Sequence, residues 1–279
     1  VQELILDRRV VRFWVNQQGH TNLPQTPTPA EPVNVFDLAV GHLMLNKGEI
    51  YYNDRQTPLA AEVHDLQAQV SFDPSKTGYD GTLGYRQGRV AFDDFNPLQH
   101  DFQVRFNATP SGLTLSQIVL ASDPFRVTAD ASMKNYASPF VEGSYQAVVS
   151  GGELGKLLKN KVLPGGKITT RGNVRYRSHP RKPFLENLSI EGQLNSDELT
   201  IDLPEARTRA RSFKGEYRLY GGTFEARKLQ ATVLDGQVAA DLTILHLADK
   251  REARLEGTMR SVSLAAARPA LPTKPQEHI

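Results

Sequence analysis

Apolar and polar residues alternate along most of this chain. The alternation is clearest at Val238, Ala240, Leu242 and Ile244, where every second side chain is apolar. Successive side chains of a strand point to opposite faces of a sheet, so this pattern predicts strands with one apolar and one polar face. Such segments are about 5 to 10 residues long and are separated by Gly, Asn, Asp and Pro, which predicts an all-β protein.

The stretch from Leu38 to Leu66 shows the pattern well. We expect a strand, a tight turn at Asn46-Lys47-Gly48, a second strand, a turn at 53–58 and a third strand, because these turn residues tolerate positive φ. A similar turn is expected at Gln87-Gly88. A register change near Ser116-Gln117 predicts a β-bulge.

One segment departs from the strand pattern. After Ser150-Gly151-Gly152, the residues Leu154, Leu157 and Leu158 follow the i, i+3, i+4 spacing of a helical face. The sequence therefore predicts one short amphipathic helix from about Glu153 to Val162, ended by Pro164 and the glycines after it.

Proline-rich stretches mark the expected boundaries between segments of the chain. We predict an N-terminal hairpin over 1–23, an extended linker over 24–32, where four prolines occur, a continuous β-domain over 33–267, and a proline-rich tail over 268–279. The chain begins with Val1, in the middle of a predicted strand. We therefore expect it to be a fragment of a longer protein.

Composition excludes several classes of protein. The 33 basic and 31 acidic residues are interspersed, which argues against a nucleic-acid surface. The one locally basic stretch, Arg171 to Lys182, is predicted to be a solvated strand edge and turn, with a contact to anionic headgroups or a partner as the alternative. There is no cysteine, and no apolar run approaches the roughly 20 residues that span a bilayer.

Candidate chemistry is weak throughout. His42 and His64 could share a metal across strands, but they lack a recognisable ligand pattern. The segment 151–156 differs from a phosphate-binding loop in spacing. The pair Asp93-Asp94 is expected to begin a turn, and Tyr51-Tyr52 to point to opposite faces. We therefore predict no catalytic, cofactor or metal site, and no enzymatic activity.

Two segments echo each other. Leu115 to Asp130 and Leu229 to Asp241 both predict a strand, a tight turn and a strand that ends in Ala-Asp. The spacing of such units along the chain is irregular, so the pattern indicates a loosely repetitive meander. Periodicity alone favours a closed sandwich or barrel but does not distinguish it from an open sheet.

A family resemblance changes this expectation. The pattern Leu-x-Leu-Asn-x-Gly-x-Ile-x-Tyr-x-Asp followed by Pro-Leu at 43–59 resembles the AsmA-like and TamB-like proteins of diderm bacteria. Leu4 to Phe13, Gly19 to Leu23, and Leu229 through Asp235-Gly236 to Val238 are similar to the same family. In order, these motifs cover most of residues 1–265. The family's N-terminal membrane anchor and its C-terminal region are not in this sequence.

The resemblance implies a long, curled antiparallel sheet, taco-like in section, whose apolar inner face forms a groove. Such proteins are periplasmic, are anchored to the inner membrane and resemble bridges that conduct phospholipid between the inner and outer membranes. The expected partners are phospholipid acyl chains, the inner membrane and possible outer-membrane assembly proteins, with no nucleic acid. An alternative function is a scaffold for outer-membrane proteins that acts through an exposed strand edge.

The candidate groove residues come from the cleanest alternations, without a prediction of which face is inside. They are Leu43, Leu45, Ile50, Tyr52, Leu66, Val70, Phe72, Phe102, Val104, Phe106, Phe125, Val127, Leu229, Val233, Val238, Ala240, Leu242 and Ile244.

Overall fold

A computed structural model describes most of the chain. The described residues are 2–22, 36–37, 40–56, 59–92, 95–160, 163–179, 182–203, 206–247, 252–261 and 263. The predicted linker over 24–32 and the predicted tail over 268–279 lie outside these ranges.

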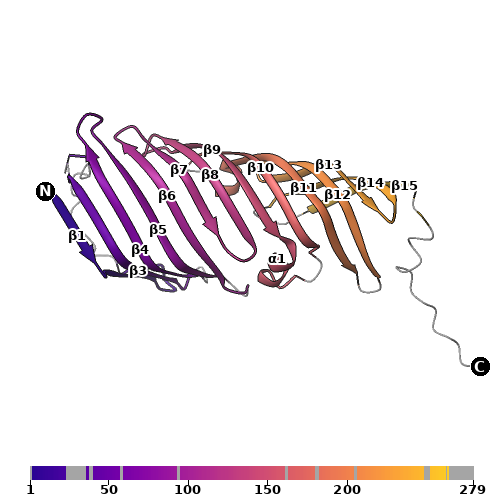
Figure 1. Ribbon diagram of the computed structural model, residues 1–279, viewed down its shortest axis with the longest axis horizontal. Helices are drawn as coiled ribbons and strands as arrows, with labels where there is room; N and C mark the ends of the chain where they lie inside the picture. The colour runs from indigo at the N-terminus through magenta and orange to yellow at the C-terminus, as the bar shows by residue number, and fades with distance from the viewer. Residues whose placement is uncertain are drawn as a thin grey trace, which may run out of the picture. The chain divides into compact units, whose positions relative to one another are not determined.

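The protein is one large mixed sheet of 15 strands that is not closed, with 74% of residues in strands and 5% in helices (Figure 1). This confirms the all-β prediction and excludes the closed sandwich or barrel that periodicity alone favoured. The strands are β1 (Glu3–Asp7), β2 (Val10–Val15), β3 (His42–Asp54), β4 (Leu59–Asp73), β5 (Gly78–Phe92), β6 (Leu98–Thr109), β7 (Gly112–Ala121), β8 (Phe125–Lys134), β9 (Phe140–Ser150), β10 (Gly165–Arg177), β11 (Leu188–Leu203), β12 (Ala206–Tyr220), β13 (Thr223–Val233), β14 (Gly236–Leu245) and β15 (Glu252–Arg260).

Strand order follows chain order from β3 to β15. From β3 to β8 and from β10 to β15, each strand pairs antiparallel with the next. The chain forms two compact units, and the boundary between them falls within β9. The first unit is Val1–Gly143 with Leu157–Lys159, and the second is Ser144–Lys156 with Asn160–Ile279.

The N-terminal segment differs from the predicted hairpin. β1 and β2 both pair parallel with β3, Glu3 opposite His42 and Val10 opposite Glu49, and they do not pair with each other. The chain does not reverse between them, since both strands run in the same direction as β3, and Arg8 between them takes a φ of 48°. β1 and β2 are therefore two halves of one edge strand.

Two predicted turns are bulges within continuous strands. Lys47 has φ 51° inside β3, and Gln87 has φ 55° inside β5, with a register shift at each position. By contrast, the reversal between β13 and β14 has two consecutive positive φ values, at Leu234 and Asp235. The bulge predicted near Gln117 is confirmed by its φ of 53° and by the register shift between Leu115 and Ile118.

Three of the bulges are stabilised by the same kind of hydrogen bond. The backbone N–H of Gln87 donates to Asp101 Oδ1 at 2.8 Å, and that of Gln117 donates to Asp130 Oδ1 at 3.1 Å. The N–H of Lys228 donates to Asp241 Oδ1 at 2.8 Å. The extra residue of a bulge lacks a ladder partner, so an aspartate on the next strand accepts its N–H instead.

The contact explains the internal echo of the sequence. Asp130 and Asp241 are the final residues of the two echoing segments, and each lies 13 residues after the bulge residue whose N–H it accepts. The repeated feature is thus a hairpin in which an aspartate of the second strand accepts a hydrogen bond from the bulge residue of the first strand.

We expect Asp130→Ala to lower the free energy of unfolding by about 1 kcal/mol, because the Gln117 N–H loses its acceptor. Asp130→Asn keeps an acceptor oxygen and should lose clearly less. Urea unfolding of the three proteins measures the difference. Equal stability of the wild type and the alanine variant would show that water replaces the carboxylate without loss.

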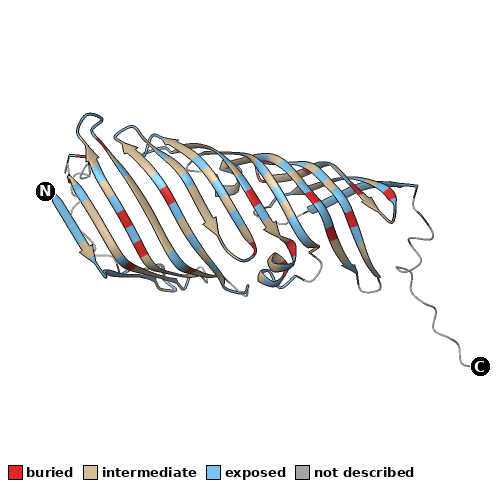
Figure 2. Ribbon diagram, in the orientation of Figure 1, coloured by how far each residue is buried: buried red, intermediate tan, exposed pale blue. Residues whose placement is uncertain are grey.

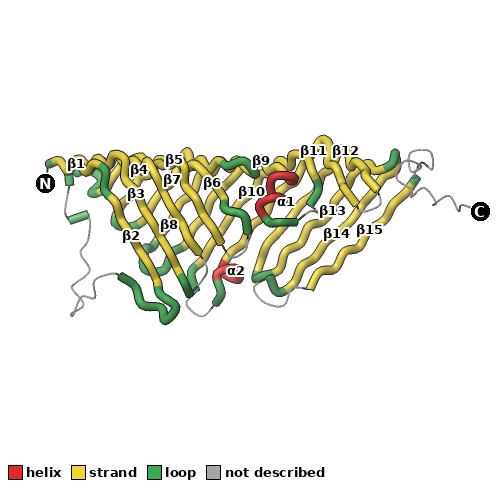
Figure 3. The backbone as a smooth tube through the Cα atoms, turned by 90° about the horizontal axis from the view of Figure 1, so that it is seen from below, coloured by secondary structure: helices red, strands yellow, loops and turns green. Residues whose placement is uncertain are grey.

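The predicted helix exists, but it starts and ends earlier than expected. α1 spans Gly151–Leu157, and a second short helix that was not predicted, α2, spans Phe184–Asn187 (Figure 3). Lys159 takes φ 51°, and the Asn160 N–H donates to the Gly155 carbonyl at 2.8 Å. This is the closing bond of a Schellman motif, so the helix cannot continue toward Val162, which itself lies outside the described residues.

Burial within the sheet is shallow. Among the described residues, no large side chain is fully buried, and the most buried apolar residues include Leu199 and Ala210, each 4% exposed. Leu199, Ala210 and Ala231 form a small cluster on β11, β12 and β13. Most strand positions are partly or fully exposed (Figure 2). A second layer would bury one face completely, so the described residues form a single layer.

Candidate functional site

Strand register brings the apolar residues of the first unit onto one face. Leu43 pairs directly with Val70, Val70 with Gly81, and Gly81 with Phe106. Paired residues of neighbouring strands point to the same side. The row continues from Phe106 to Leu115 and from there to Ala131.

The bulges keep this face continuous. Leu45 pairs with Ala68 and Gly48 with Leu66, so the extra residue in β3 shifts the alternation and Ile50 stays on the same side as Leu45. A strand of this length without the bulge would turn Ile50 and Tyr52 to the opposite face. The bulge at Lys47 is therefore what places both halves of β3 on one apolar surface.

All candidate residues of the first unit share this face. Leu66 and Val104 are buried and the others are partly exposed. The set is Leu43, Leu45, Ile50, Tyr52, Leu66, Val70, Phe72, Phe102, Val104, Phe106, Phe125 and Val127.

The second unit has an apolar face of the same kind. Val238 pairs with Ala231, and Leu242 pairs with Ala226. The face reaches the edge strand, where Met259 lies opposite Val238 and Leu255 lies opposite Leu242. The candidate residues on it are Leu229, Val233, Val238, Ala240, Leu242 and Ile244, all partly exposed. We call these two surfaces the apolar faces of the first and second units.

Nothing among the described residues covers the end of the second apolar face. Leu255 is 70% exposed and Met259 is 53% exposed, although both lie in line with apolar neighbours on β14. These two side chains extend the apolar face of the second unit onto its edge strand.

Polar groups occur at a few positions of the apolar faces. In the first unit, His100 lies edge-on to the Tyr85 ring at 5.5 Å, and its Nδ1 is buried without a hydrogen-bond partner. In the second unit, the hydroxyls of Tyr145 and Tyr217 form a hydrogen bond, and Thr170 Oγ1 lies 2.6 Å from the Tyr217 hydroxyl.

The Tyr145 hydroxyl stays protonated in this setting. Burial, together with the hydrogen bond to Tyr217, raises the pKa of Tyr145 well above its usual value. Burial disfavours the charged phenolate, so the group is a neutral donor and acceptor over the physiological range.

The opposite face is polar and carries ion pairs. Glu62 lies 3.6 Å from Arg89, and Glu198 lies 3.5 Å from both Arg209 and Arg211. These pairs are solvent-exposed and contribute little stability individually. The two faces of the sheet therefore differ in chemistry as the alternation predicted.

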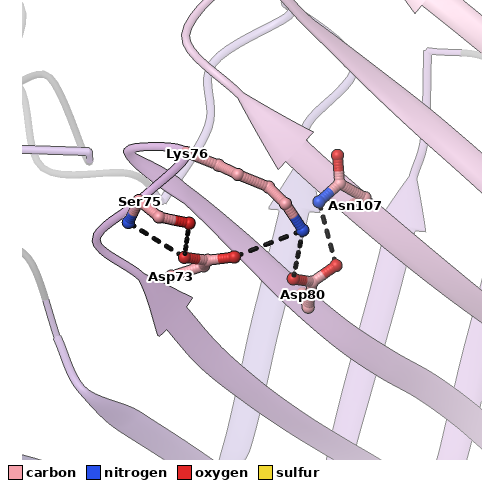
Figure 4. A network of polar contacts seen from close by, with 5 residues as sticks. All are labelled: Asp73, Ser75, Lys76, Asp80 and Asn107. Atoms are coloured by element: carbon pink, nitrogen blue, oxygen red, sulfur yellow. Dashed lines mark hydrogen bonds and ion pairs between the residues drawn. The ribbon is translucent and has the colours of Figure 1, made fainter.

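A polar network ties the β4–β5 turn together (Figure 4). Asp73 Oδ1 accepts from the Ser75 hydroxyl at 2.6 Å and from its N–H at 2.9 Å, and Lys76 Nζ lies 3.2 Å from Asp73 Oδ2. Asp80 accepts from the Asn107 amide at 2.9 Å. The hydrogen bond from the Ser75 side chain and the contact with Lys76 lower the pKa of Asp73.

This lowered pKa predicts a pH dependence of stability. The ionised Asp73 is stabilised in the folded state, so its contribution is present above the usual Asp pKa and is lost as the pH falls through the folded value. We expect Asp73→Asn to be less stable than the wild type at neutral pH, with a gap that narrows on acidification. Thermal unfolding across this pH range measures the gap, and a gap independent of pH would contradict the assignment.

The residues that the sequence analysis considered for metal binding or phosphate binding do not form a site among the described residues. Among the described residues, no group of three or more His, Asp or Glu side chains could hold a metal ion. His42 contacts Ser71 at 3.0 Å and His64 lies 3.7 Å from Glu62, so the two histidines occupy separate surroundings. Lys156 is paired with Glu153 at 2.7 Å on α1. Asp93 and Asp94 lie outside the described residues.

The tyrosine doublet divides between the faces as predicted. The Tyr51 hydroxyl donates to Glu49 at 2.8 Å, and Arg12 lies over the Tyr51 ring on the polar face. Tyr52 is on the apolar face, where its hydroxyl contacts Asp54 at 3.2 Å. In the basic stretch, Arg171 on β10 donates to Gln193 at 3.2 Å on the polar face.

Sequence reasoning missed the hydroxyl cluster of Tyr145, Thr170 and Tyr217. Tyr145 and Tyr217 are 72 residues apart, and their contact depends on the register of β9 through β12. The available signal was a glycine inside β10 and another inside β11, since a mid-strand glycine often marks a close approach of another group.

The described helices contain no segment long and apolar enough to cross a membrane. No family model matches the chain, and neither a curated protein nor a solved structure matches it.

Proposed function

We propose that this chain is part of an AsmA-like or TamB-like protein that carries phospholipid along the apolar faces of its sheet. The observation that carries the proposal is the single, unclosed layer whose apolar faces are only partly buried. Each acyl methylene removed from water on such a face gains roughly 0.8 kcal/mol. Transfer of this kind needs no covalent step, so the proposed protein is not an enzyme.

The remaining parts of the proposal follow from the resemblance of residues 43–59 and the other matching segments to that family. The protein would act in the periplasm and contribute to envelope biogenesis between the two membranes. A segment outside this chain would anchor it to the inner membrane. Acyl chains lie on the apolar faces, and headgroups remain in water.

Native mass spectrometry of the purified chain tests the proposal. We expect phospholipid to co-purify, and a delipidated sample to take up phospholipid from vesicles. A folded, delipidated chain that takes up no phospholipid would overturn the proposal.

A second candidate function rests on the difference between the sheet edges. Asn22 covers the β2 edge: its Nδ2 donates to the Arg12 carbonyl at 2.7 Å, and the Trp14 N–H donates to its Oδ1 at 2.9 Å. In the described part of the chain, no strand pairs with the outer edge of β15. A free edge can accept a strand from a partner, as a scaffold for outer-membrane proteins would require.

Site-specific crosslinking separates the two functions. A photoreactive residue at Thr258 on β15 should crosslink to an unfolded outer-membrane protein if the edge is a scaffold. Crosslinking in a chain that binds no phospholipid favours the scaffold, whereas phospholipid binding without protein crosslinks favours transfer.

A further inference from the structure

Two tyrosines lie across the apolar face of the second unit above a pair of glycines. Gly172 on β10 pairs directly with Gly192 on β11, and Gly192 pairs with Tyr217 on β12. A Cβ added to Gly172 would lie 2.8 Å from the Tyr145 hydroxyl, and one added to Gly192 would lie 2.6 Å from the Tyr217 hydroxyl. The glycines thus leave the space that the tips of both rings occupy.

Three strands contribute hydroxyls to this point. Tyr145 comes from β9, Thr170 from β10 and Tyr217 from β12, and the hydroxyls contact one another. All three side chains remain partly exposed. We call Tyr145, Thr170 and Tyr217 the hydroxyl cluster.

Apolar residues flank the cluster on both sides. On one side, Val174 pairs with Ile190 and Ile190 with Leu219. On the other side, Thr170 itself pairs with Leu194, and Leu229 packs over Gly215. The hydroxyl cluster is therefore a polar island within the apolar face.

An acyl chain lying on the hydroxyl cluster would leave part of its hydrogen-bonding capacity unsatisfied. Each hydroxyl has one hydrogen to donate and two lone pairs, so mutual contacts satisfy only part of its hydrogen-bonding capacity. Covering the cluster with an acyl chain removes the water that satisfies the remainder, which is unfavourable. The ester carbonyl oxygens of a diacyl lipid supply acceptors and lie directly beside the two tails.

We propose that the hydroxyl cluster binds the acyl-ester oxygens of a glycerophospholipid whose tails lie on the flanking apolar rows. This inference rests on the proposed function, because it assigns a fixed contact point within the lipid path. It predicts that the protein recognises the ester linkage and not hydrocarbon alone.

Competition between two lipids tests this. Dioleoyl phosphatidylcholine and its dioleyl ether analogue differ in the carbonyl oxygens, while the headgroup is the same and the tails match closely. In native mass spectrometry of the delipidated chain with equal amounts of both, we expect the wild type to prefer the diacyl lipid about fivefold, the effect of one neutral hydrogen bond. Tyr145→Phe with Tyr217→Phe keeps both rings and should bring the ratio close to one.

Controls separate recognition from folding. Tyr220→Phe, on the same strand as Tyr217 but 62% exposed, should retain the preference. Thr170→Val should lower it, since valine matches threonine in shape without the hydroxyl. Equal binding of both lipids by the wild type, or a preference retained in the double phenylalanine variant, would overturn the inference while leaving the proposed function intact. Binding of neither lipid would overturn the proposed function as well.

Discussion

Aspartate at positions 238, 240 and 242 should abolish phospholipid binding by the second unit. Val238, Ala240 and Leu242 lie on its apolar face and are partly exposed. A carboxylate covered by acyl chains loses its water without gaining a partner, which costs several kcal/mol. The triple variant should therefore bind phospholipid more than about a hundredfold less tightly, because each 1.4 kcal/mol is a factor of ten. Vesicle uptake and native mass spectrometry report the loss.

The same strand offers a matched control. Gln237→Asp, Ala239→Asp and Thr243→Asp place three carboxylates on the opposite face of β14 and should leave lipid uptake close to that of the wild type. The neighbouring alanines make the sharpest comparison, because Ala239 is exposed on the polar face and Ala240 is not. A folded V238D/A240D/L242D protein that still binds phospholipid normally would refute the role of this face.

The second large effect is expected at the start of α1. A Cβ added to Gly151 would lie 1.9 Å from the Pro164 carbonyl oxygen, so the backbone itself must move. We expect Gly151→Ala to lower the free energy of unfolding by about 3 kcal/mol. Chemical denaturation followed by circular dichroism measures this.

The adjacent glycine provides the comparison. Nothing lies within 4 Å of a Cβ added to Gly152, and the residue is helical. Gly152→Ala should therefore be neutral or should stabilise the protein by up to about 1 kcal/mol, since alanine favours the helix over glycine. Similar losses in both variants would mean that the helix start adjusts freely and that the Pro164 contact is not tight.

Much of the fold was predictable because alternation reports directly on the two faces of a strand. The residues from Val238 to Ile244 were assigned to a common face from spacing alone, and the register of β13 and β14 places them there. The open, single-layer arrangement was not predictable from periodicity, because a sandwich requires the same alternation. The strand order of one unclosed sheet and the shallow burial of the described residues distinguish the two.

Composition predicted turns at Asn46-Lys47-Gly48 and Gln87-Gly88, where the structure has bulges within strands, and the reason is physical. Asn46-Lys47-Gly48 and Asp235-Gly236 both supply residues that accept positive φ, but the first continues its strand and the second belongs to a reversal. Lys47 takes a positive φ alone inside β3, whereas Leu234 and Asp235 take it together between β13 and β14. Pairing with neighbouring strands decides this, and local composition does not record it.

The candidate surface was only partly predictable. Apolar residues were found by their spacing, whereas the hydroxyl cluster depends on contacts between strands far apart in sequence. The aspartates that fasten the bulges were visible only as the repeated Ala-Asp ending of two segments. Their role appeared once Gln117 and Lys228 were placed opposite Asp130 and Asp241.

The amide of Asn22 has a consequence for self-association. Copies that stack head to tail into a fibre need two free edges per molecule, and Asn22 occupies the Arg12 and Trp14 backbone groups on one of them. Among the described residues, the five-residue β1 is what remains on that side for propagation, against nine residues of β15 on the other. Each contact in such a stack therefore pairs β15 of one copy with a short, weak template on the next, which disfavours open-ended aggregation at high concentration.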